Sequence, residues 1–291
     1  MYFSGRCFLL YRDSLMAMRL KDALSGVLTV EEQQTLVGSY DVVGDIAIII
    51  IPECLQAREL LIANAILADN GRIKVVAKRA GFYGGEFRTL PLTILAGEDR
   101  KETEVREFGI RLRLNAERVY FSIRSGNERR RIASLVAPDE SVLVLFSGVA
   151  PYPLAISRFS GVRTVVGIEK NPEAHAYAVQ NLQLNKKLQN IALYNGDAAA
   201  VLPTLQETFD RVIMPLPTMA ETFLVDALQV LKPGGYLHFY DLQRPDCFTD
   251  SVAKISAACL AENRLLENFS IVRCGHCGPR TYRICIDARI H

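Results

Sequence analysis

The stretch from Ser141 to Asp197 constrains the fold of this chain more than any other part. Its hydrophobic pattern predicts a buried strand, a glycine-containing turn and a helix, then a strand ending in Glu169, another helix, and a third strand ending at Asp197. Because the carboxyl ends of parallel strands line one crevice, the turn and the two carboxylates would meet around one nucleoside-like ligand. We therefore expect an α/β, Rossmann-like fold.

The turn after the first of these strands argues against a dinucleotide as that ligand. A pyrophosphate needs the glycines of G-x-G-x-x-G to approach the helix N-terminus, whereas the turn from Phe146 to Pro151 holds one glycine only. Ala150 and Pro151 would restrict the approach of a phosphate. A cofactor without a phosphate does not need this space, so the pattern favours S-adenosylmethionine.

Two carboxylates are expected to hold the nucleoside of this cofactor. Glu169 follows an apolar strand and can accept hydrogen bonds from both ribose hydroxyls, while Asp197 is placed for the adenine amino group. An alternative stays open, in which Glu169 is an exposed strand-end carboxylate and Asp197 caps a helix. The residues predicted to bind the cofactor are Phe146, Ser147, Gly148, Val149, Glu169, Lys170, Asn171, Asp197, Ala198 and Met214.

Composition narrows the class of protein. With 291 residues and a hydrophobic fraction of 49%, the chain can form one large domain or two ordinary ones. With 34 Lys and Arg against 32 Asp and Glu, the net charge is close to neutral. Only a local basic patch could therefore bind phosphates. No apolar run approaches the roughly 20 residues that span a bilayer, and the N-terminus lacks the features of a signal peptide. We expect a cytoplasmic monomer.

The seven cysteines are scattered, which suits a reducing compartment better than a disulfide framework. One pair is close, Cys274 and Cys277. A lone C-x-x-C without a second pair is weak evidence for zinc, and a redox pair normally opens a helix after a strand. We predict no metal.

The pattern divides the chain at about residue 117. Residues 1–19 are an N-terminal extension, residues 20–117 a small α/β domain that contacts RNA, and residues 118–291 the cofactor-binding domain. Within them we expect a turn over residues 41–45 leading into a strand over 46–52, a helix from Glu53 to Leu67, a helix start at Asn171, and an antiparallel closing hairpin over residues 266–290.

Basic residues gather before the sheet of the cofactor-binding domain and within the small domain. The run Arg129-Arg130-Arg131 would fan around a helix, and guanidinium groups suit phosphates or a cofactor carboxylate, although a solvated helix surface stays an alternative. The residues predicted to contact RNA are Lys74, Lys78, Arg79, Arg124, Arg129 and Arg131.

A proline pair follows the fourth strand of the cofactor domain, in Met214-Pro215-Leu216-Pro217. The prolines fix the backbone and leave carbonyl oxygens unpaired by any following helical turn. Such carbonyls can accept from a planar N–H group brought beside a methyl donor. A plain strand terminator stays the alternative.

Taken in order, these motifs resemble the archaeal and eukaryotic tRNA (guanine-N1)-methyltransferases, which modify the purine at position 37, next to the anticodon. The resemblance runs from about Leu20 to the C-terminus and is carried by SYDVVGDIAII, GEFR, ILAGEDRKETEVREFG, VYFSIRSGNERRRIA, the cofactor motifs and MPLP. It implies a small α/β domain before a class I methyltransferase domain, S-adenosylmethionine as cofactor, and methyl transfer to guanine N1 in the anticodon arm of tRNA.

The resemblance also implies roles for single residues. Glu128 matches the general base that removes the N1 proton, and Arg88 matches the arginine that steadies negative charge on O6. The backbone from Pro215 to Pro217 would hold the flipped base against the methyl group. The chain departs from the family at Val144, where the family has an aspartate, and at Pro215, where it has an asparagine.

Two alternative functions stay open. The related aminocarboxypropyl transferase of wybutosine synthesis uses the same cofactor, although the proline turn after the fourth strand argues for methyl transfer. A noncatalytic RNA-binding relative with a degenerate pocket is given weight by Val144 and Pro215. Many family members also carry a further N-terminal domain that touches the tRNA elbow, and we expect recognition here to rest on the anticodon arm alone.

Overall fold

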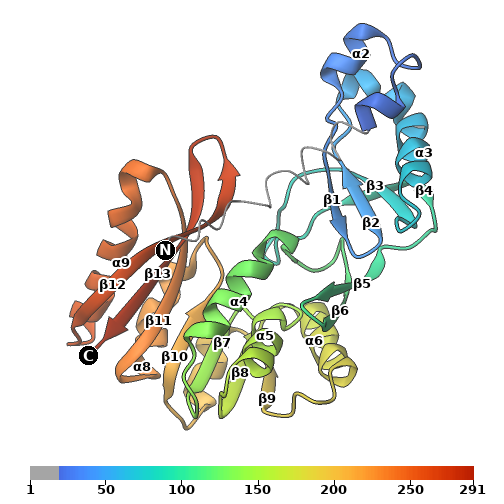
Figure 1. The fold of residues 1–291 in the computed structure, drawn as a ribbon. Coiled ribbons are helices and arrows are strands. Elements are labelled where there is room, and N and C mark those ends of the chain that lie inside the picture. The colour runs from blue at the N-terminus through green and yellow to red at the C-terminus, as the bar shows by residue number, and fades with distance from the viewer. Residues whose placement is uncertain (1–19) are drawn as a thin grey trace, which may run out of the picture. The chain divides into compact units, whose positions relative to one another are not determined.

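The computed structural model describes residues 20–291 (Figure 1). The predicted N-terminal extension, residues 1–19, lies outside the described residues. The described chain forms two compact units, one from residues 20–105 and 114–120, the other from residues 106–113 and 121–291. No helix within residues 20–291 is long and apolar enough to cross a membrane.

The first unit is built on a four-stranded sheet in the order β1-β2-β3-β4. The β1–β2 and β3–β4 pairs are antiparallel and β2–β3 is parallel. One face of the sheet packs against α3, where Ile49 and Val76 meet Ile62 and Ile66 in a buried cluster. The elements are α2 (Val30–Thr35), β1 (Tyr40–Val43), β2 (Ile46–Ile49), η1 (Glu53–Arg58), α3 (Glu59–Asp69), β3 (Val75–Arg79) and β4 (Leu92–Gly97).

Three predictions for this unit need correction. The strand expected over residues 46–52 is β2, which ends at Ile49. Residues 41–43, expected in a turn, lie in β1, and the turn is confined to Gly44 and Asp45, with Gly44 at φ 61. The helix expected from Glu53 begins as the 3-10 helix η1 and becomes α-helical only at Glu59. The residue before η1 is Pro52, which makes no side-chain cap, so the first turn tightens instead of opening a capped α-helix.

A hairpin of β5 (Glu102–Glu107) and β6 (Ile110–Asn115) carries the chain between the two units. Its tip contains Gly109 at φ 81. The chain then passes through η2 (Ile123–Ser125) into α4 (Gly126–Leu135).

The second unit contains a seven-stranded sheet in the order β12-β13-β11-β10-β7-β8-β9, seen in Figure 1 from green through red. The strands β11, β10, β7, β8 and β9 are parallel, whereas β13 is antiparallel to β11 and to β12. The Rossmann-like fold and the closing hairpin are thus confirmed. The bounds are β7 (Ser141–Leu145), β8 (Thr164–Glu169), β9 (Ile191–Asn195), β10 (Phe209–Met214), β11 (Leu231–Gln243), β12 (Leu266–Gly278) and β13 (Thr281–Ile290).

Helices cover both faces of this sheet. In β7, Val142 and Val144 pack with α4 and α5, while the alternate residues Leu143 and Leu145 pack with α8 and α9. Both faces of a central parallel strand are therefore apolar, and Val144 belongs to the core. The helices are α5 (Pro151–Phe159), α6 (Pro172–Leu184), α7 (Ala198–Val201), α8 (Leu224–Gln229) and α9 (Phe248–Ala261), with short 3-10 turns η3 (Leu202–Thr204), η4 (Ala220–Phe223) and η5 (Pro245–Cys247).

The order of the strands identifies the place where a ligand would bind. From β7 the chain moves outward to β8 and β9, then returns to the other side of β7 to form β10 and β11. The strand order thus reverses between β7 and β10. In open α/β sheets, ligands bind at the carboxyl ends of the strands at such a reversal.

Candidate active site

The turn that follows β7 lies at this reversal and has an unusual backbone. Phe146, Gly148 and Ala150 all have positive φ, at 54°, 57° and 67°. Only glycine adopts this region without steric cost, so Phe146 and Ala150 are held in it by their surroundings. We call residues 146–150 the cofactor turn. Strain of this kind gathers at ligand-binding positions.

The carboxylate of Glu169, at the end of β8, holds the cofactor turn in place. Its Oε2 accepts from the backbone N–H of Gly148 at 2.7 Å, and its Oε1 accepts from the N–H of Asn171 at 2.7 Å. Burial raises the pKa of this carboxyl above its ordinary value, although the backbone donors oppose the shift. Each oxygen keeps a lone pair for a further donor such as a ribose hydroxyl.

Asn181 secures the other side of the turn, and the sequence interpretation missed it. The residue is fully buried in α6, and its Nδ2 donates to the carbonyl of Val149 at 3.0 Å and to that of Arg113 at 3.1 Å. Its Oδ1 accepts from the N–H of Arg113 at 2.7 Å. A sequence signal existed, because Asn181 continues the buried stripe of Ala174 and Ala178 at helical spacing.

One polar atom of the turn has no protein partner. The hydroxyl of Ser147 is buried and makes no hydrogen bond. A buried hydroxyl without a partner is costly, so its presence indicates a ligand that completes it. Gly167 lies directly against it, since a Cβ there would come within 3.1 Å of Ser147 Oγ and 2.8 Å of Leu193 Cδ2. These groups fit a cofactor that brings donors and acceptors but no phosphate.

Asp197 caps a helix, the role considered above as the alternative to an adenine contact. Its Oδ1 accepts from Ala199 N–H at 3.0 Å as the N-cap of α7, and its Oδ2 pairs with Lys170 Nζ at 2.7 Å. The bond from Lys170 holds the pKa of Asp197 below its ordinary value. A cap and an adenine contact are compatible, because a carboxylate has further lone pairs.

The other predicted cofactor residues border the same strand ends. Asn171 caps α6, as predicted, and its Oδ1 accepts from the N–H of Glu173 at 3.0 Å. Ala198 begins α7, and Met214 is the fully buried last residue of β10. After Met214 the chain is irregular through residue 219, with Pro215 half-buried and Pro217 buried.

Glu128 lies on the face of the sheet covered by α4 and α5, and its side chain is only 7% exposed. Arg131 donates two hydrogen bonds to its carboxylate, from Nη2 to Oε1 at 2.7 Å and from Nε to Oε2 at 2.8 Å. The hydroxyl of Tyr240, on β11, donates to Oε1 at 2.5 Å, and the hydroxyl of Tyr152 donates to that of Tyr240 at 3.1 Å. Helical spacing places Arg131 beside Glu128, whereas no sequence motif places Tyr240 or Tyr152 there.

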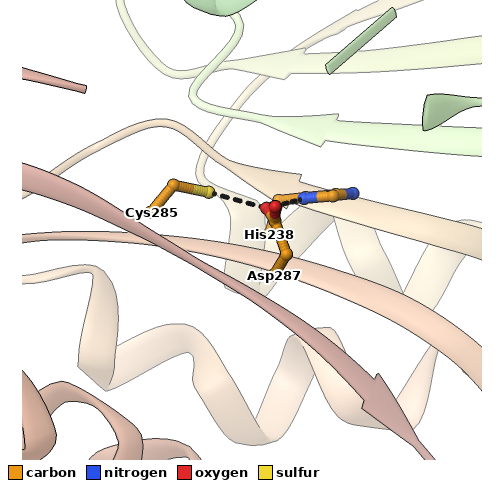
Figure 2. Close-up of side chains that lie close together, drawn as sticks. All are labelled: His238, Cys285 and Asp287. Carbon is orange, nitrogen blue, oxygen red and sulfur yellow. Dashed lines mark hydrogen bonds and ion pairs between the residues drawn. The ribbon is translucent and has the colours of Figure 1, made fainter. Parts of the chain in front are cut away.

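The network continues from Arg131 to a cluster on β11 and β13 (Figure 2). Arg131 Nη1 donates to Asp287 Oδ2 at 2.6 Å, and His238 Nδ1 lies 2.6 Å from Asp287 Oδ1. Since Arg211 can only donate to His238 Nε2, at 2.6 Å, His238 carries its proton on Nδ1 and donates to Asp287. We call Glu128, Arg131, Tyr240, Asp287 and His238 the Glu128 network.

His238, Cys285 and Asp287 also bring three potential metal-ligand atoms within 4.8 Å of one another. Their surroundings oppose a cation, because guanidinium groups of Arg131 and Arg211 already contact the cluster. Burial lowers the pKa of His238 and raises that of Cys285, which keeps both neutral. The cluster is therefore interpreted as part of an ion-pair network.

Arg88 belongs to the first unit, and its place is given within that unit. It lies in the loop between β3 and β4 with a positive φ of 51°, and its guanidinium lies 5.0 Å from the centre of the Tyr120 ring. Tyr83 meets the edge of the same ring, with centroids 5.5 Å apart. An arginine on an aromatic face is oriented by a cation–π contact.

The residues predicted to contact RNA fall into two groups. Lys74 and Arg124 are exposed, while Lys78 pairs with Glu59 and Arg79 with Asp41 at the surface. By contrast, Arg129 is 2% exposed and bonds Glu107 through both Nε and Nη2, and Arg131 holds Glu128 and Asp287. The guanidinium groups of these two arginines are taken up by carboxylates.

A cavity of about 470 Å³ opens elsewhere in the second unit, between α9 and β12. It is lined by Ser256, Cys259, Leu260, Arg264, Leu265, Leu266, Glu267, Asn268 and Phe269. None of the predicted site residues lines it, so it is not the candidate active site.

Comparison with known protein families is consistent with this geometry. Residues 103–265 match the model described as the TRM5/TYW2 methyltransferase domain, and residues 20–100 match the TYW2 N-terminal domain. Among curated proteins, the chain is 32% identical over 269 residues to the tRNA (guanine(37)-N(1))-methyltransferase Trm5b of Pyrococcus abyssi, covering 89% of this chain and 77% of the relative. It is 34% identical over 211 residues to the tRNA 4-demethylwyosine(37)-methyltransferase Taw21 of Saccharolobus solfataricus, covering 72% and 80%.

Solved structures share the fold. The crystal structure of Trm5b from Pyrococcus abyssi superposes with a TM-score of 0.81 at 30% identity, covering 90% of this chain and 78% of that one. A complex of aTrm5 with tRNALeu has a TM-score of 0.74 at 28% identity, covering 100% and 80%. At 20% identity, the structure of M. jannaschii TYW2 in complex with AdoMet shows the fold alone, with a TM-score of 0.67 over 87% of this chain and 99% of that one.

Proposed function

Because this chain belongs to the TRM5/TYW2 methyltransferase family, we propose that it transfers the methyl group of S-adenosylmethionine to N1 of guanosine 37 in tRNA. The observation that carries the proposal is the 32% identity, over 89% of the chain, to a relative named for that reaction. The cofactor turn at the reversal of strand order supports the same cofactor from the structure alone.

The chain's own residues supply the binding groups. Glu169 would take the ribose hydroxyls, and the hydroxyl of Ser147 and the carboxylate of Asp197 would complete the nucleoside contacts. When bound, the cofactor supplies an electrophilic methyl group on a sulfonium. The turn's strained backbone and its anchoring by Glu169 and Asn181 fix where this group would lie.

The catalytic roles follow the sequence prediction. Glu128 would remove the proton from guanine N1, which holds it at neutral pH. Arg88 would stabilise negative charge on O6, and the backbone from Pro215 to Pro217 would hold the edge of the base. The base must leave the anticodon loop to reach the site, as is general for chemistry on a base.

For the RNA contact we retain Lys74, Lys78, Arg79 and Arg124, and leave out Arg129 and Arg131, whose guanidinium groups already bind buried carboxylates. We infer contact with the anticodon arm, action as a monomer, and location in the cytoplasm. Phosphate contacts of this kind predict that tRNA binding weakens as salt concentration rises.

Two related reactions are favoured by particular observations. The 34% identity to Taw21 favours 4-demethylwyosine at position 37 as a second methyl acceptor. The match of residues 20–100 to the TYW2 N-terminal domain favours aminocarboxypropyl transfer. Product mass separates methyl from aminocarboxypropyl transfer, at about 14 against about 101 daltons added, because a different bond to sulfur breaks.

The proposal is tested by incubating the purified protein and labelled cofactor with unmodified tRNA transcripts that carry G or A at position 37. We expect label on the G37 transcript only, with loss of label in Glu128→Ala and Arg88→Ala. Equal labelling of both transcripts would reject guanine specificity. A tRNA that carries 4-demethylwyosine at position 37 is tested beside them, and a product heavier by about 101 daltons on that tRNA would assign the aminocarboxypropyl reaction instead.

A further inference from the structure

We propose that Tyr240 and Arg131 are positioning residues that fix the Glu128 carboxylate so that its Oε2 is the atom that accepts the proton from the base. The inference rests on the proposed function, since Glu128 acts as a base only if the reaction removes a proton. It adds which oxygen acts and which residues, far apart in the sequence, hold it there.

The hydrogen bonds at Glu128 distinguish its two oxygens. Oε1 accepts from both Tyr240 OH, at 2.5 Å, and Arg131 Nη2, at 2.7 Å. Oε2 accepts from Arg131 Nε alone, at 2.8 Å. A carboxylate oxygen has two lone pairs, so Oε1 is saturated and Oε2 keeps one. A proton from the substrate can therefore be received at Oε2 without breaking a bond that holds the side chain.

Tyr240 can act only as a donor to this carboxylate. Burial raises the pKa of its hydroxyl well above the ordinary value, so the group stays protonated. Its own oxygen accepts from Tyr152 OH at 3.1 Å, which directs its proton toward Glu128. The phenol ring is buried in the core between β11 and α5, which leaves the hydroxyl little freedom to turn away.

Arg131 is in turn fixed from its far side. Its Nη1 and Nη2 both reach Asp287, at 2.6 and 3.3 Å, while its Nε and Nη2 hold Glu128. Asp287 is oriented by His238, as Figure 2 shows. His238 contacts Arg211, which is anchored by both oxygens of Glu140. A guanidinium held at both ends presents its fork in one orientation.

The proton transfer balances as follows. The N1–H bond of guanine breaks and an O–H bond forms at Glu128 Oε2. The electron pair left on N1 forms the bond to the methyl carbon, and the carbon–sulfur bond breaks with its pair remaining on sulfur. The proton on Oε2 returns to solvent after the product leaves.

The test compares Tyr240→Phe with Tyr236→Phe in the full-length protein, using the G37 transcript. Tyr236 lies on the same strand, and its ring packs on the guanidinium of Arg211, a contact that phenylalanine keeps. Tyr236→Phe therefore controls for loss of a tyrosine hydroxyl on β11. For Tyr240→Phe we expect kcat to fall about tenfold, a fraction of the 10²–10⁴ that a general base contributes. KM for tRNA and Kd for the cofactor should change by less than about twofold, because the hydroxyl touches neither.

The pH profile distinguishes positioning from mere stabilisation. The groups that face Glu128 are Arg131 on α4, Tyr152 on α5, Tyr240 on β11 and Cys285 on β13, with Asp287 on the far side of Arg131. Tyr240→Phe removes a donor that favours the charged carboxylate. The acid limb of the kcat profile should therefore move to higher pH, while Tyr236→Phe keeps the wild-type limb.

A second variant tests the other holding residue. Arg131→Lys keeps the positive charge but loses the forked guanidinium donors, so kcat should fall by at least as much as in Tyr240→Phe. The thermal unfolding midpoint of both variants is recorded as a check on their folding. Unchanged kcat and pH profile in Tyr240→Phe would overturn the inference. So would a loss shared equally by Tyr236→Phe, or a change confined to KM. A wild-type protein that leaves the G37 transcript unlabelled would overturn the proposed function first, and this inference with it.

Discussion

The cofactor turn and the Glu128 network lie in the same unit and are built in opposite ways. The turn gathers its parts from nearby sequence: backbone N–H groups of Gly148 and Asn171 converge on Glu169. The network gathers charged side chains from α4, β11 and β13, across the span from Glu128 to Asp287. One region stores backbone strain, and the other balances buried charge.

The difference indicates how each region should respond to change. A site made of backbone donors around one carboxylate depends on that carboxylate and tolerates changes nearby. A buried charge network fails as a whole, because removal of one partner leaves the others uncompensated in a poorly solvated interior. Substitutions in the network should therefore cost stability, and those in the turn should cost cofactor affinity.

The largest expected effect is that of Asp287→Ala, which leaves Arg131 and His238 without their shared acceptor. Breaking a buried ion pair by removing one partner costs about 3–5 kcal/mol in the free energy of unfolding, measured by urea denaturation. Asp246→Ala removes an exposed partner of Arg244, and the expected loss is below about 1 kcal/mol. Equal losses in the two variants would contradict the idea that the network acts as a buried unit.

Glu169→Gln should have the next largest effect, and on affinity instead of stability. The amide cannot accept from Gly148 and Asn171 at the same time as it receives two ribose hydroxyls. We expect Kd for S-adenosylmethionine, measured by calorimetry, to rise about 100-fold, equivalent to about 2.7 kcal/mol. The exposed Glu207→Gln serves as the control with unchanged Kd. A change of less than about threefold would remove Glu169 from the cofactor site.

The pH dependence of cofactor binding should show the same carboxyl. Burial raises the pKa of Glu169, so as pH falls it is protonated before an ordinary glutamate would be. Because the ionised form accepts the ribose hydroxyls, affinity should fall by up to about tenfold per pH unit below that pKa, starting above the ordinary glutamate value of about 4.3. The decline should disappear in Glu169→Gln. A wild-type decline that begins only below about pH 4 would contradict this assignment.

The smallest expected effect concerns the strain of the turn itself. Ala150→Gly relieves a left-handed residue by about 1–2 kcal/mol, which roughly offsets the lost methyl group and the greater freedom of glycine when unfolded. Ala155→Gly, in α5, has no strain to relieve and should cost about 1–2 kcal/mol. Equal costs in urea denaturation would show that the turn at Ala150 is not strained.

Local patterns predicted much of the cofactor side. The apolar runs predicted the central strands, Asn171 the start of α6, and the alternation after residue 266 the closing hairpin. These succeed because strand burial and helix capping depend on neighbours a few residues away. The start of the helix after Pro52 was predicted less well, since a helix end without a cap is decided by fine geometry.

The arginine run shows the limit of such patterns. Read locally, Arg129 and Arg131 are two cations of a three-arginine run suited to phosphate. In the fold they neutralise Glu107, Glu128 and Asp287, carboxylates that the linear sequence places 22, 3 and 156 positions away. Helical spacing accounts for Glu128, but no spacing rule predicts Glu107 or Asp287, which only the fold brings near.

The sequence by itself determined the succession of strands and helices along the chain, the glycine-poor turn and the carboxylate that ends β8. It could do so because periodicity and turn chemistry act over short stretches of chain. The tertiary structure alone decided which charges are buried together: that Tyr240 meets Glu128, and that His238 and Asp287 hold Arg131. The physical reason is that burial and charge pairing depend on the packing of the whole sheet, which puts β13 beside β11 under α4.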